Sequence, residues 1–386
     1  MSKKIKMGMV GGGIGAFIGE VHRKVAALDG HIDLVCGAFS SNPERSQETG
    51  KQLYLDENRV YDTYQQMFDE ELKLPESESM DMVSIVTPNH LHFEPAKLAL
   101  ENGFHVVCDK PITISLEEAK ELKILTEETG LIFALTHTYT GYPMVKQARD
   151  MVADGVFGDI KKVVVEYPQG WLATRMEESN KQAAWRSDPK KSGKVGAMGD
   201  IGTHAENLVS YITGLKIDKL CADLSTIVDG RVLDDDGNVL LRYNNGARGV
   251  LHCSQISAGE ENNLKIYVYG EKGGFEWHQH EPNTLLVKHR EGPTEVYRTG
   301  VDKGYLSEGA MAHTRIPGGH PEGYMEAFAN IYRNVAKVIQ AKLEGNEPDP
   351  QYLDFPGVDD GVEGMAFIDT VVESTNSDKK WTEMKT

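Results

Sequence analysis

Residues 5–16 read IKMGMVGGGIGA, a short apolar run that passes directly into closely spaced glycines. The run Ile5–Val10 has the length of a buried strand, and Gly11, Gly13 and Ala16 fit the pattern G-x-G-x-x-A. An apolar stripe at helical spacing follows, formed by Ile18, Val21, Val25 and Leu28. Glycines let a pyrophosphate approach the backbone, and the amides of a helix N-terminus stabilise its charge. The stretch favours a dinucleotide site, with a purely structural glycine turn as the alternative.

Four more apolar runs, with helical patterns between them, follow in the first third of the chain: Ile32–Ala38, Met82–Val86, Phe104–Cys108 and Leu131–Leu135. Runs that are apolar on both faces and separated by helices are typical of a parallel sheet covered by helices. We therefore predict an α/β fold with an N-terminal doubly wound Rossmann domain over residues 1–137.

The pattern changes after Tyr139. Segments of alternating polarity are joined by turn signals such as Asn244-Asn245-Gly246, which indicate hairpins. Helical patterns cover about 144–154, 322–343 and 359–374. We expect residues 138–386 to form an α+β domain on a mainly antiparallel sheet, which binds the substrate and mediates oligomerisation.

The composition excludes several classes of protein. The 386 residues hold 41 Lys+Arg and 59 Asp+Glu, a formal charge of −18, and this argues against nucleic acid, whose binding needs clustered basic residues. No long uncharged apolar run occurs, so we expect no membrane segment, and the four scattered cysteines fit a cytoplasmic protein.

The second apolar run ends in Phe39-Ser40-Ser41, with Arg45 nearby, where a carboxylate for the ribose of NAD is usual. Two hydroxyls and an arginine can hold the 2′-phosphate of NADP, but Arg45 can equally cap or stack at the surface. We expect NAD, with NADP not excluded. The cofactor-binding residues that we predict are Gly11, Gly13, Ile14, Ala16, Phe17, Ser40, Ser41, Arg45, Thr87, Pro88, Asn89, His92, Asp109 and Lys110.

Polar clusters follow two of the expected strands, at Thr87–His92 and at Asp109-Lys110-Pro111. Ligands of open α/β sheets bind beyond the carboxyl ends of the strands, so both clusters should face the cofactor. A lysine held before a proline at such a strand end can donate a hydrogen bond to a reacting hydroxyl. Lys110 is our first catalytic candidate, with a solvated loop lysine as the alternative.

Residues 199–212 have helical periodicity, with an apolar stripe and a polar one. The polar stripe places Asp200 and His204 on one face. This spacing suits a general base with a carboxylate that orients it, although an ordinary surface pair has the same spacing.

Together these residues resemble the Gfo/Idh/MocA oxidoreductases of sugars and inositols. The likeness rests on the glycine turn, on Thr87-Pro88-Asn89 with His92, on Asp109-Lys110-Pro111 in place of the family's Glu-Lys-Pro, and on Asp200-x-x-x-His204. Finer motifs around Trp185, 198–204 and 317–324 are similar to the branch with levoglucosan dehydrogenase and glucoside 3-dehydrogenases.

The resemblance implies that Lys110 and His204 are the catalytic acid/base pair, with Asp200 holding the substrate hydroxyl or the histidine. Further residues that we expect to contact the substrate are Tyr139, Trp185, Arg186 and His320. No metal is predicted, because His278 and His280 have no acidic residues clustered with them, and Asp234–Asp236 reads as a solvated turn.

We therefore predict an NAD(P)-dependent dehydrogenase that oxidises a secondary hydroxyl of a sugar, anhydrosugar or glycoside. The alternatives are an inositol dehydrogenase, an NAD-dependent redox glycosidase and a non-catalytic nucleotide-sensing protein. Relatives commonly pair through the outer face of the second sheet, so we expect a homodimer or homotetramer.

Overall fold

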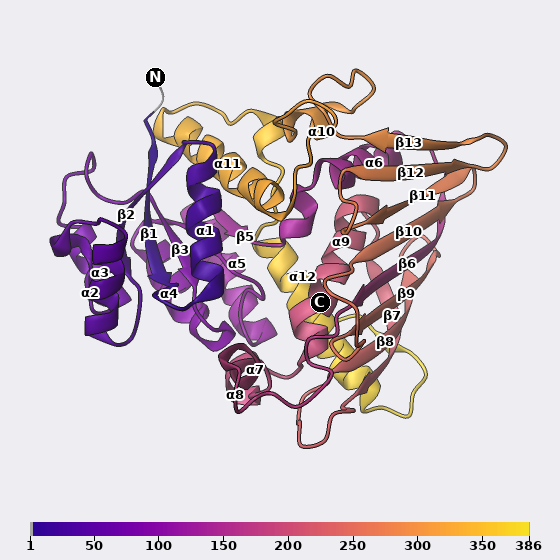
Figure 1. Cartoon of the computed structure of the whole chain (residues 1–386), viewed down its shortest axis with the longest axis horizontal. Coiled ribbons are helices and arrows are strands. Elements are labelled where there is room, and N and C mark those ends of the chain that lie inside the picture. The colour runs from indigo at the N-terminus through magenta and orange to yellow at the C-terminus, as the bar shows by residue number, and fades with distance from the viewer. Residues whose placement is uncertain (1–2, 386) are drawn as a thin grey trace. The chain divides into compact units, whose positions relative to one another are not determined.

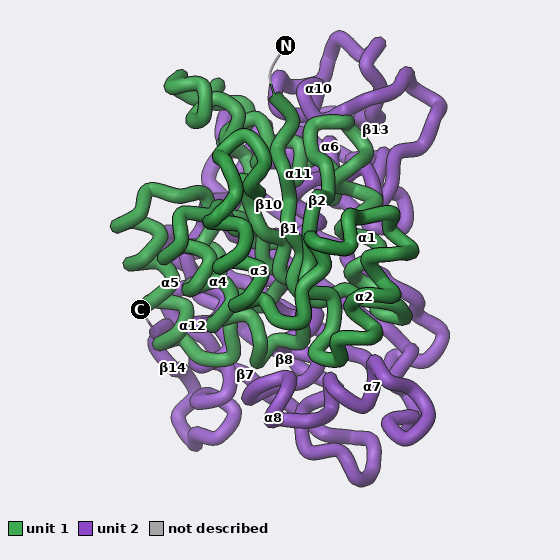
Figure 2. Tube along the Cα trace, turned by 90° about the vertical axis from the view of Figure 1, so that its left-hand side faces the viewer, with its two compact units in different colours: residues 1–137, 328–362 green, residues 138–327, 363–386 purple. Residues whose placement is uncertain are grey.

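The computed structural model describes residues 3–385, which form two compact units. Unit 1 contains residues 1–137 and 328–362, and unit 2 contains residues 138–327 and 363–386 (Figure 2). Two of the three boundaries fall inside long helices, α11 (Tyr324–Leu343) and α12 (Val358–Thr375), and the third lies between His137 and Thr138. The assignment of residues 138–386 to substrate binding and oligomerisation stays a prediction.

Unit 1 is built on a parallel five-stranded sheet in the order β2-β1-β3-β4-β5 (Figure 1). Its strands and helices are β1 (Ile5–Gly11), α1 (Phe17–Leu28), β2 (Ile32–Ala38), α2 (Pro43–Gln52), α3 (Tyr64–Glu71), β3 (Met82–Val86), α4 (Phe93–Glu101), β4 (His105–Cys108), α5 (Leu116–Thr129) and β5 (Phe133–Leu135). Every residue of β3 and β4 is buried, as expected for strands covered on both faces. The predicted Rossmann sheet is confirmed.

Unit 2 contains a nine-stranded sheet in the order β13-β12-β11-β10-β6-β9-β8-β7-β14. Its strands are β6 (Ile160–Pro168), β7 (Ile217–Ser225), β8 (Asp236–Tyr243), β9 (Arg248–Ser254), β10 (Lys265–Gly270), β11 (Gly273–His278), β12 (Thr284–His289), β13 (Thr294–Arg298) and β14 (Thr382–Glu383). The sheet is mainly antiparallel, as predicted, and β6 with β9 is a parallel pair.

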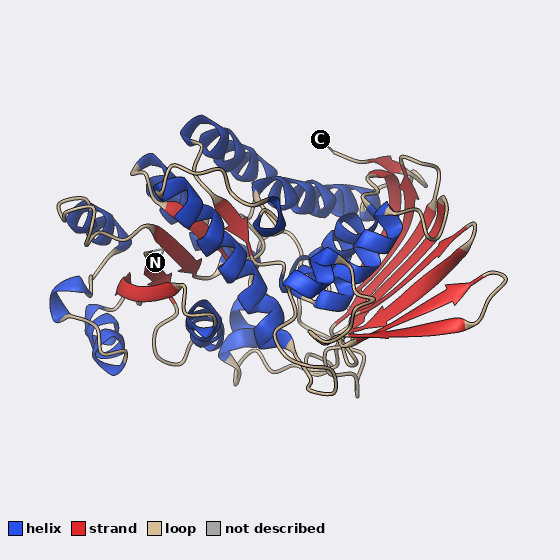
Figure 3. Ribbon diagram, turned by 90° about the horizontal axis from the view of Figure 1, so that it is seen from above, coloured by secondary structure: helices blue, strands red, loops and turns tan. Residues whose placement is uncertain are grey.

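The helices of unit 2 that matter here are α6 (Pro143–Ala153), α7 (Lys181–Arg186), α8 (Pro189–Ser192), α9 (Thr203–Thr213) and α10 (Glu308–Ala312). Helices α6 and α9 pack against one face of the sheet (Figure 3). Alternate residues of β8 are buried, which is the pattern of a strand with one covered face. Asn244-Asn245-Gly246 forms the predicted hairpin between β8 and β9, with Gly246 at φ 88°.

Candidate active site

The glycine turn after β1 has the shape that a dinucleotide pyrophosphate needs. Gly11 and Gly12 have φ of 83° and 71°, a region that side chains disfavour. A Cβ on Gly13 would lie 2.8 Å from the carbonyl oxygen of Phe39. Helix α1 begins after Ala16 with no side-chain cap, so its first amides are not held by a capping side chain. The cradle therefore fits NAD.

Sequence reasoning missed Gly19, which packs the first turn of α1 against the glycine turn. A Cβ at Gly19 would overlap the backbone of Gly12. The guanidinium of Arg23 donates to the Gly12 carbonyl at 2.6 Å and holds the turn from the same helix. A glycine inside an apolar helical stripe is the signal that could have revealed this close approach.

The predicted adenosine end lies beside the same turn. Arg45 Nη2 is 3.4 Å from the Ile14 carbonyl, and the Ile14 amide donates to Thr49 Oγ1 at 3.2 Å. Ser40 Oγ accepts from the Asn42 amide at 3.1 Å. The structure thus brings Arg45 to the glycine turn, whereas the choice between NAD and NADP by these residues stays a prediction.

His92 ties together the two polar loops that follow β3 and β4. Its Nδ1 lies 2.7 Å from the Pro111 carbonyl, its Nε2 lies 2.8 Å from the Thr87 carbonyl, and the side chain is fully buried. Burial lowers the pKa of His92, although Asp109 and the two carbonyls oppose this. Through these hydrogen bonds His92 connects the loop after β3 to the loop after β4. Its contact with the cofactor stays a prediction.

Asp109, which directly precedes the candidate lysine in the chain, has a partly buried side chain that is 18% exposed. Its Oδ1 accepts from Thr136 Oγ1 at 2.7 Å and from the Lys110 amide at 3.0 Å, and His22 Nε2 lies 3.8 Å away. Burial alone would raise the pKa of Asp109, but His22, Lys110 and Thr136 outweigh it and hold that pKa well below its usual value. Asp109 is therefore charged at neutral pH and fixes the backbone of Lys110.

A helix from the end of the chain completes this network. Tyr332 on α11 has its hydroxyl 2.7 Å from His22 Nδ1 and 2.8 Å from Ser84 Oγ. All three side chains are buried. The contact explains why residues 328–362 belong to unit 1.

Lys110 stands at the same sheet edge as the glycine turn. Gly11 pairs with Val86, and Ile85 pairs with Cys108, so β1, β3 and β4 end side by side. Lys110 follows β4 by two residues. The structure thus brings together the predicted glycine turn, Thr87 loop and lysine within unit 1.

In unit 2, Asp200 lies in a π-helical turn (Met198–Gly202) that leads into α9, where the sequence predicted one regular helix. Asp200 Oδ2 accepts from Arg186 Nε at 3.1 Å and from Gln255 Nε2 at 2.8 Å. The Arg186 guanidinium also stacks 4.3 Å above the ring of Trp185. These contacts stabilise the negative charge of the Asp200 carboxylate.

His204, one turn further along, is enclosed by aromatic rings. The ring of Tyr139 meets it edge to face, with centroids 4.9 Å apart and an interplanar angle of 85°. Tyr167, whose side chain is also buried, lies 6.4 Å from His204 between centroids. The structure therefore brings Tyr139 and His204 together, as the predicted site requires, and adds Tyr167, which the sequence did not indicate.

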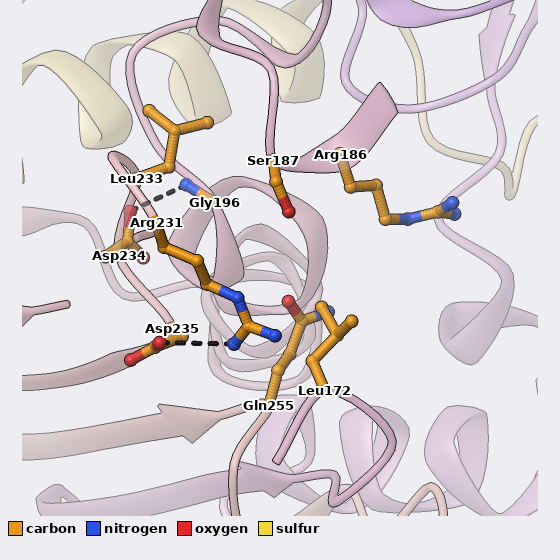
Figure 4. A pocket seen from close by; sticks show the side chains of 9 residues that line it. All are labelled: Leu172, Arg186, Ser187, Gly196, Arg231, Leu233, Asp234, Asp235 and Gln255. Carbon is orange, nitrogen blue, oxygen red and sulfur yellow. Dashed lines mark hydrogen bonds and ion pairs between the residues drawn. The ribbon is translucent and has the colours of Figure 1, made fainter. Parts of the chain in front are cut away.

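Asp234 and Asp235 line a small pocket together with Arg186 and Gln255, the two side chains that bond to Asp200, and their contacts correct one prediction (Figure 4). The prediction that Asp234–Asp236 is a solvated turn is wrong, because Asp234 and Asp235 accept internal hydrogen bonds and Asp236 begins β8. Asp234 accepts from the backbone amides of Gly196 and Met198 at 2.6 and 2.7 Å. Asp235 is 1% exposed and accepts from Arg231 Nη1 at 3.2 Å (Figure 4). Asp234 therefore holds the segment before Asp200 in place, and Asp235 holds the loop that carries Arg231.

We expect Asp235→Ala to lower the free energy of unfolding by about 3–5 kcal/mol, because it leaves a buried arginine without one carboxylate. The Arg231 side chain is only 4% exposed. Chemical denaturation measures the change, and Asp229→Ala, at an exposed position of the same loop, is the control. Equal stability of the two variants would contradict the buried ion pair.

Among the predicted substrate residues, His320 lies apart from the contacts described above. His320 is exposed in the loop before α11, with Nδ1 3.2 Å from the Pro317 carbonyl, and its contact with substrate stays a prediction. Within residues 3–385 no group of three or more His, Cys, Asp or Glu side chains is arranged to hold a metal. None of the helices in that range is long and apolar enough to cross a membrane.

Two family models and several known proteins are similar to this chain. A family described as "Oxidoreductase family, NAD-binding Rossmann fold" matches residues 5–137, and "GFO/IDH/MocA C-terminal domain" matches residues 145–276. The uncharacterized oxidoreductase YfiI of Bacillus subtilis is 37% identical over 100% of this chain and 98% of its own.

Two further similarities involve proteins with named ligands or substrates. A crystal structure of an inositol dehydrogenase homolog from Azotobacter vinelandii, complexed with NADH and myo-inositol, is 34% identical, with a TM-score of 0.91 over 99% of this chain and 98% of that chain. Levoglucosan dehydrogenase of Pseudarthrobacter phenanthrenivorans is 25% identical over 96% of both chains.

The fold and the glycine turn thus define an NAD-binding oxidoreductase. The chain belongs to the Gfo/Idh/MocA family, and residues 5–137 form its NAD-binding Rossmann domain.

Proposed function

We propose that this protein oxidises a secondary hydroxyl of a neutral cyclic polyol or sugar, with NAD as the hydride acceptor. The observation that carries the proposal is the shared edge of the parallel sheet, where Lys110 follows β4 beside the glycine turn that follows β1. A cation at that edge is suited to stabilise charge developing on a substrate oxygen near a bound nicotinamide.

The residues divide the reaction between them. Bound NAD supplies the hydride-accepting nicotinamide. His204 accepts the proton of the substrate hydroxyl. The carbon that bears this hydroxyl gives up its hydrogen as a hydride to the nicotinamide, and the product is a ketone. Lys110 stabilises the alkoxide that develops on the oxygen, and Asp200 holds the hydroxyl or the imidazole in register.

A neutral substrate is supported by the way Arg186 is used. Its guanidinium donates to Asp200 at 3.1 Å and to Gln182 Oε1 at 2.7 Å, and it stacks on Trp185. An arginine committed to a carboxylate is poorly placed to bind a phosphate of the substrate as well. The aromatic surface of Trp185 suits the apolar face of a ring.

Inositol now ranks as the first substrate class to test. The homolog with bound myo-inositol is 34% identical over almost the whole chain, whereas levoglucosan dehydrogenase is 25% identical. Levoglucosan and glucosides, which the motifs around Trp185 favour, are the second class.

A parallel assay of inositols, anhydrosugars, glycosides and sugar phosphates, each with NAD and with NADP, tests the proposal. We expect NADH to form with a neutral cyclic substrate and the corresponding ketone to accumulate in equal amount. Release of an aglycone without net NADH would instead identify a redox glycosidase. Binding of NAD without turnover of any compound would identify a nucleotide sensor, and turnover only of sugar phosphates would contradict the neutral site.

A further inference from the structure

We infer that Tyr167, Gln169, Gln255 and Asn262 are positioning residues, which join Asp200 to the aromatic wall of His204 through one directed chain of hydrogen bonds. The inference rests on the proposed function, because it assigns these side chains to the alignment of the proposed base. All of them lie in unit 2.

Two groups at the Asp200 end of the chain fix the direction of its hydrogen bonds, because one can only accept a hydrogen and the other can only donate one. The carboxylate of Asp200 accepts, so Gln255 donates to it through Nε2. The indole of Trp171 donates, at 3.0 Å, so Gln169 receives it on Oε1. Gln255 Nε2 also lies 3.4 Å from that same Oε1. The amide nitrogen of Gln169 is therefore the group that donates to Asn262 Oδ1, at 2.6 Å.

At the other end, three side chains close a ring. Asn262 Oδ1 accepts from the Tyr167 hydroxyl at 2.7 Å, and Asn262 Nδ2 donates to the Tyr139 hydroxyl at 3.0 Å. The two tyrosine hydroxyls are also hydrogen-bonded to each other. Because the hydrogen of Tyr167 is given to Asn262, the hydrogen of Tyr139 must be given to Tyr167.

This ring decides what Tyr139 offers to the site. Its hydroxyl donates to Tyr167 and accepts from Asn262, so its ring rather than its hydroxyl is the part that acts on His204. Burial raises the pKa of both tyrosines, which keeps the phenols protonated and the ring of hydrogen bonds intact. The predicted role of Tyr139 is thereby sharpened from substrate contact to alignment of the imidazole.

Alignment matters because proton transfer needs the imidazole nitrogen within hydrogen-bond reach of the substrate hydroxyl, and small misplacements cost about 100-fold in rate. The chain connects two groups at once: Asp200, four residues before the base, through Gln255, and the Tyr139 ring, which packs on the base, through Asn262. Loss of any link should therefore loosen the same alignment.

The test compares Tyr167→Phe, Gln255→Leu and the double variant with the wild-type protein. We expect each single variant to lower kcat about 10-fold with little change in KM or in NAD affinity. We expect the kcat of the double variant to be only slightly below that of the less active single variant, because both substitutions break the same chain. Tyr269→Phe, at an exposed tyrosine of β10, is the matched control and should keep full activity.

A multiplicative loss in the double variant, or a change confined to KM, would overturn the inference. If Tyr167→Phe does not fold, Asn262→Ala opens the same ring from the other side. A readout independent of turnover is the imidazole NMR signal of His204, assigned with His204→Gln. Tyr167→Phe and Gln255→Leu should both shift this signal, and an unshifted signal contradicts the chain. Absence of turnover in the wild-type protein would instead count against the proposed function alone.

Discussion

Lys110→Ala should lower kcat by about 100- to 10,000-fold while the protein stays folded and still binds NAD. The expected loss is large because the ammonium group is the proposed stabiliser of the developing alkoxide. The fold should tolerate the change, since the partners of Asp109 in the structure include the Lys110 backbone amide, which alanine retains. Steady-state kinetics and NAD titration measure the two effects separately.

Lys51→Ala, at an exposed lysine of α2 in the same unit, is the matched control and should keep wild-type rates. Near-normal turnover by Lys110→Ala would remove the lysine from the chemistry. Loss of NAD binding with normal kcat at saturation would instead make Lys110 a cofactor contact.

His204→Gln should also lower kcat by about 100- to 10,000-fold, because glutamine keeps much of the side-chain volume but cannot accept the hydroxyl proton. The remaining activity should rise with pH, as hydroxide in solvent replaces the missing base. A profile of kcat against pH for both proteins measures this change.

His252→Gln, on β9, is the control for replacing a histidine of unit 2, and its activity should be unchanged. A His204→Gln variant with the wild-type pH profile would show that another group accepts the proton.

The parallel sheet could be predicted because its strands are mostly buried, and β3, β4 and β5 are buried along their whole length. β2 and β3 begin and end where the apolar runs do, at Ile32–Ala38 and Met82–Val86. Strand β13 in the second sheet lacks such an apolar signal. The exposed face of β13 shows why, since four of its five residues are exposed and leave no apolar period to read.

The candidate site also contains residues that local sequence patterns indicated and residues that they did not. Local patterns indicated Gly11, Gly13, Lys110, Asp200 and His204, because a turn, a strand end and a helix face are each written in a few neighbouring residues. The chain from Gln255 through Gln169 to Asn262 spans more than 90 residues and carries no local signal. The burial of Asp235 was missed for a related reason, because its partner Arg231 looks like an ordinary surface residue in sequence.

The central claim is that Lys110 and His204 act together in the step that breaks the substrate C–H bond. The direct measurement is the deuterium isotope effect on kcat, with a cyclic substrate deuterated at the ring carbons, for the wild-type protein, Lys110→Ala, His204→Gln and the double variant. We predict that all three variants show a primary isotope effect on kcat at least as large as that of the wild type. We also predict that the kcat of the double variant is close to that of the slower single variant. An isotope effect that vanishes in either slow variant would contradict the account, because the lost residue would then serve a step other than hydride transfer.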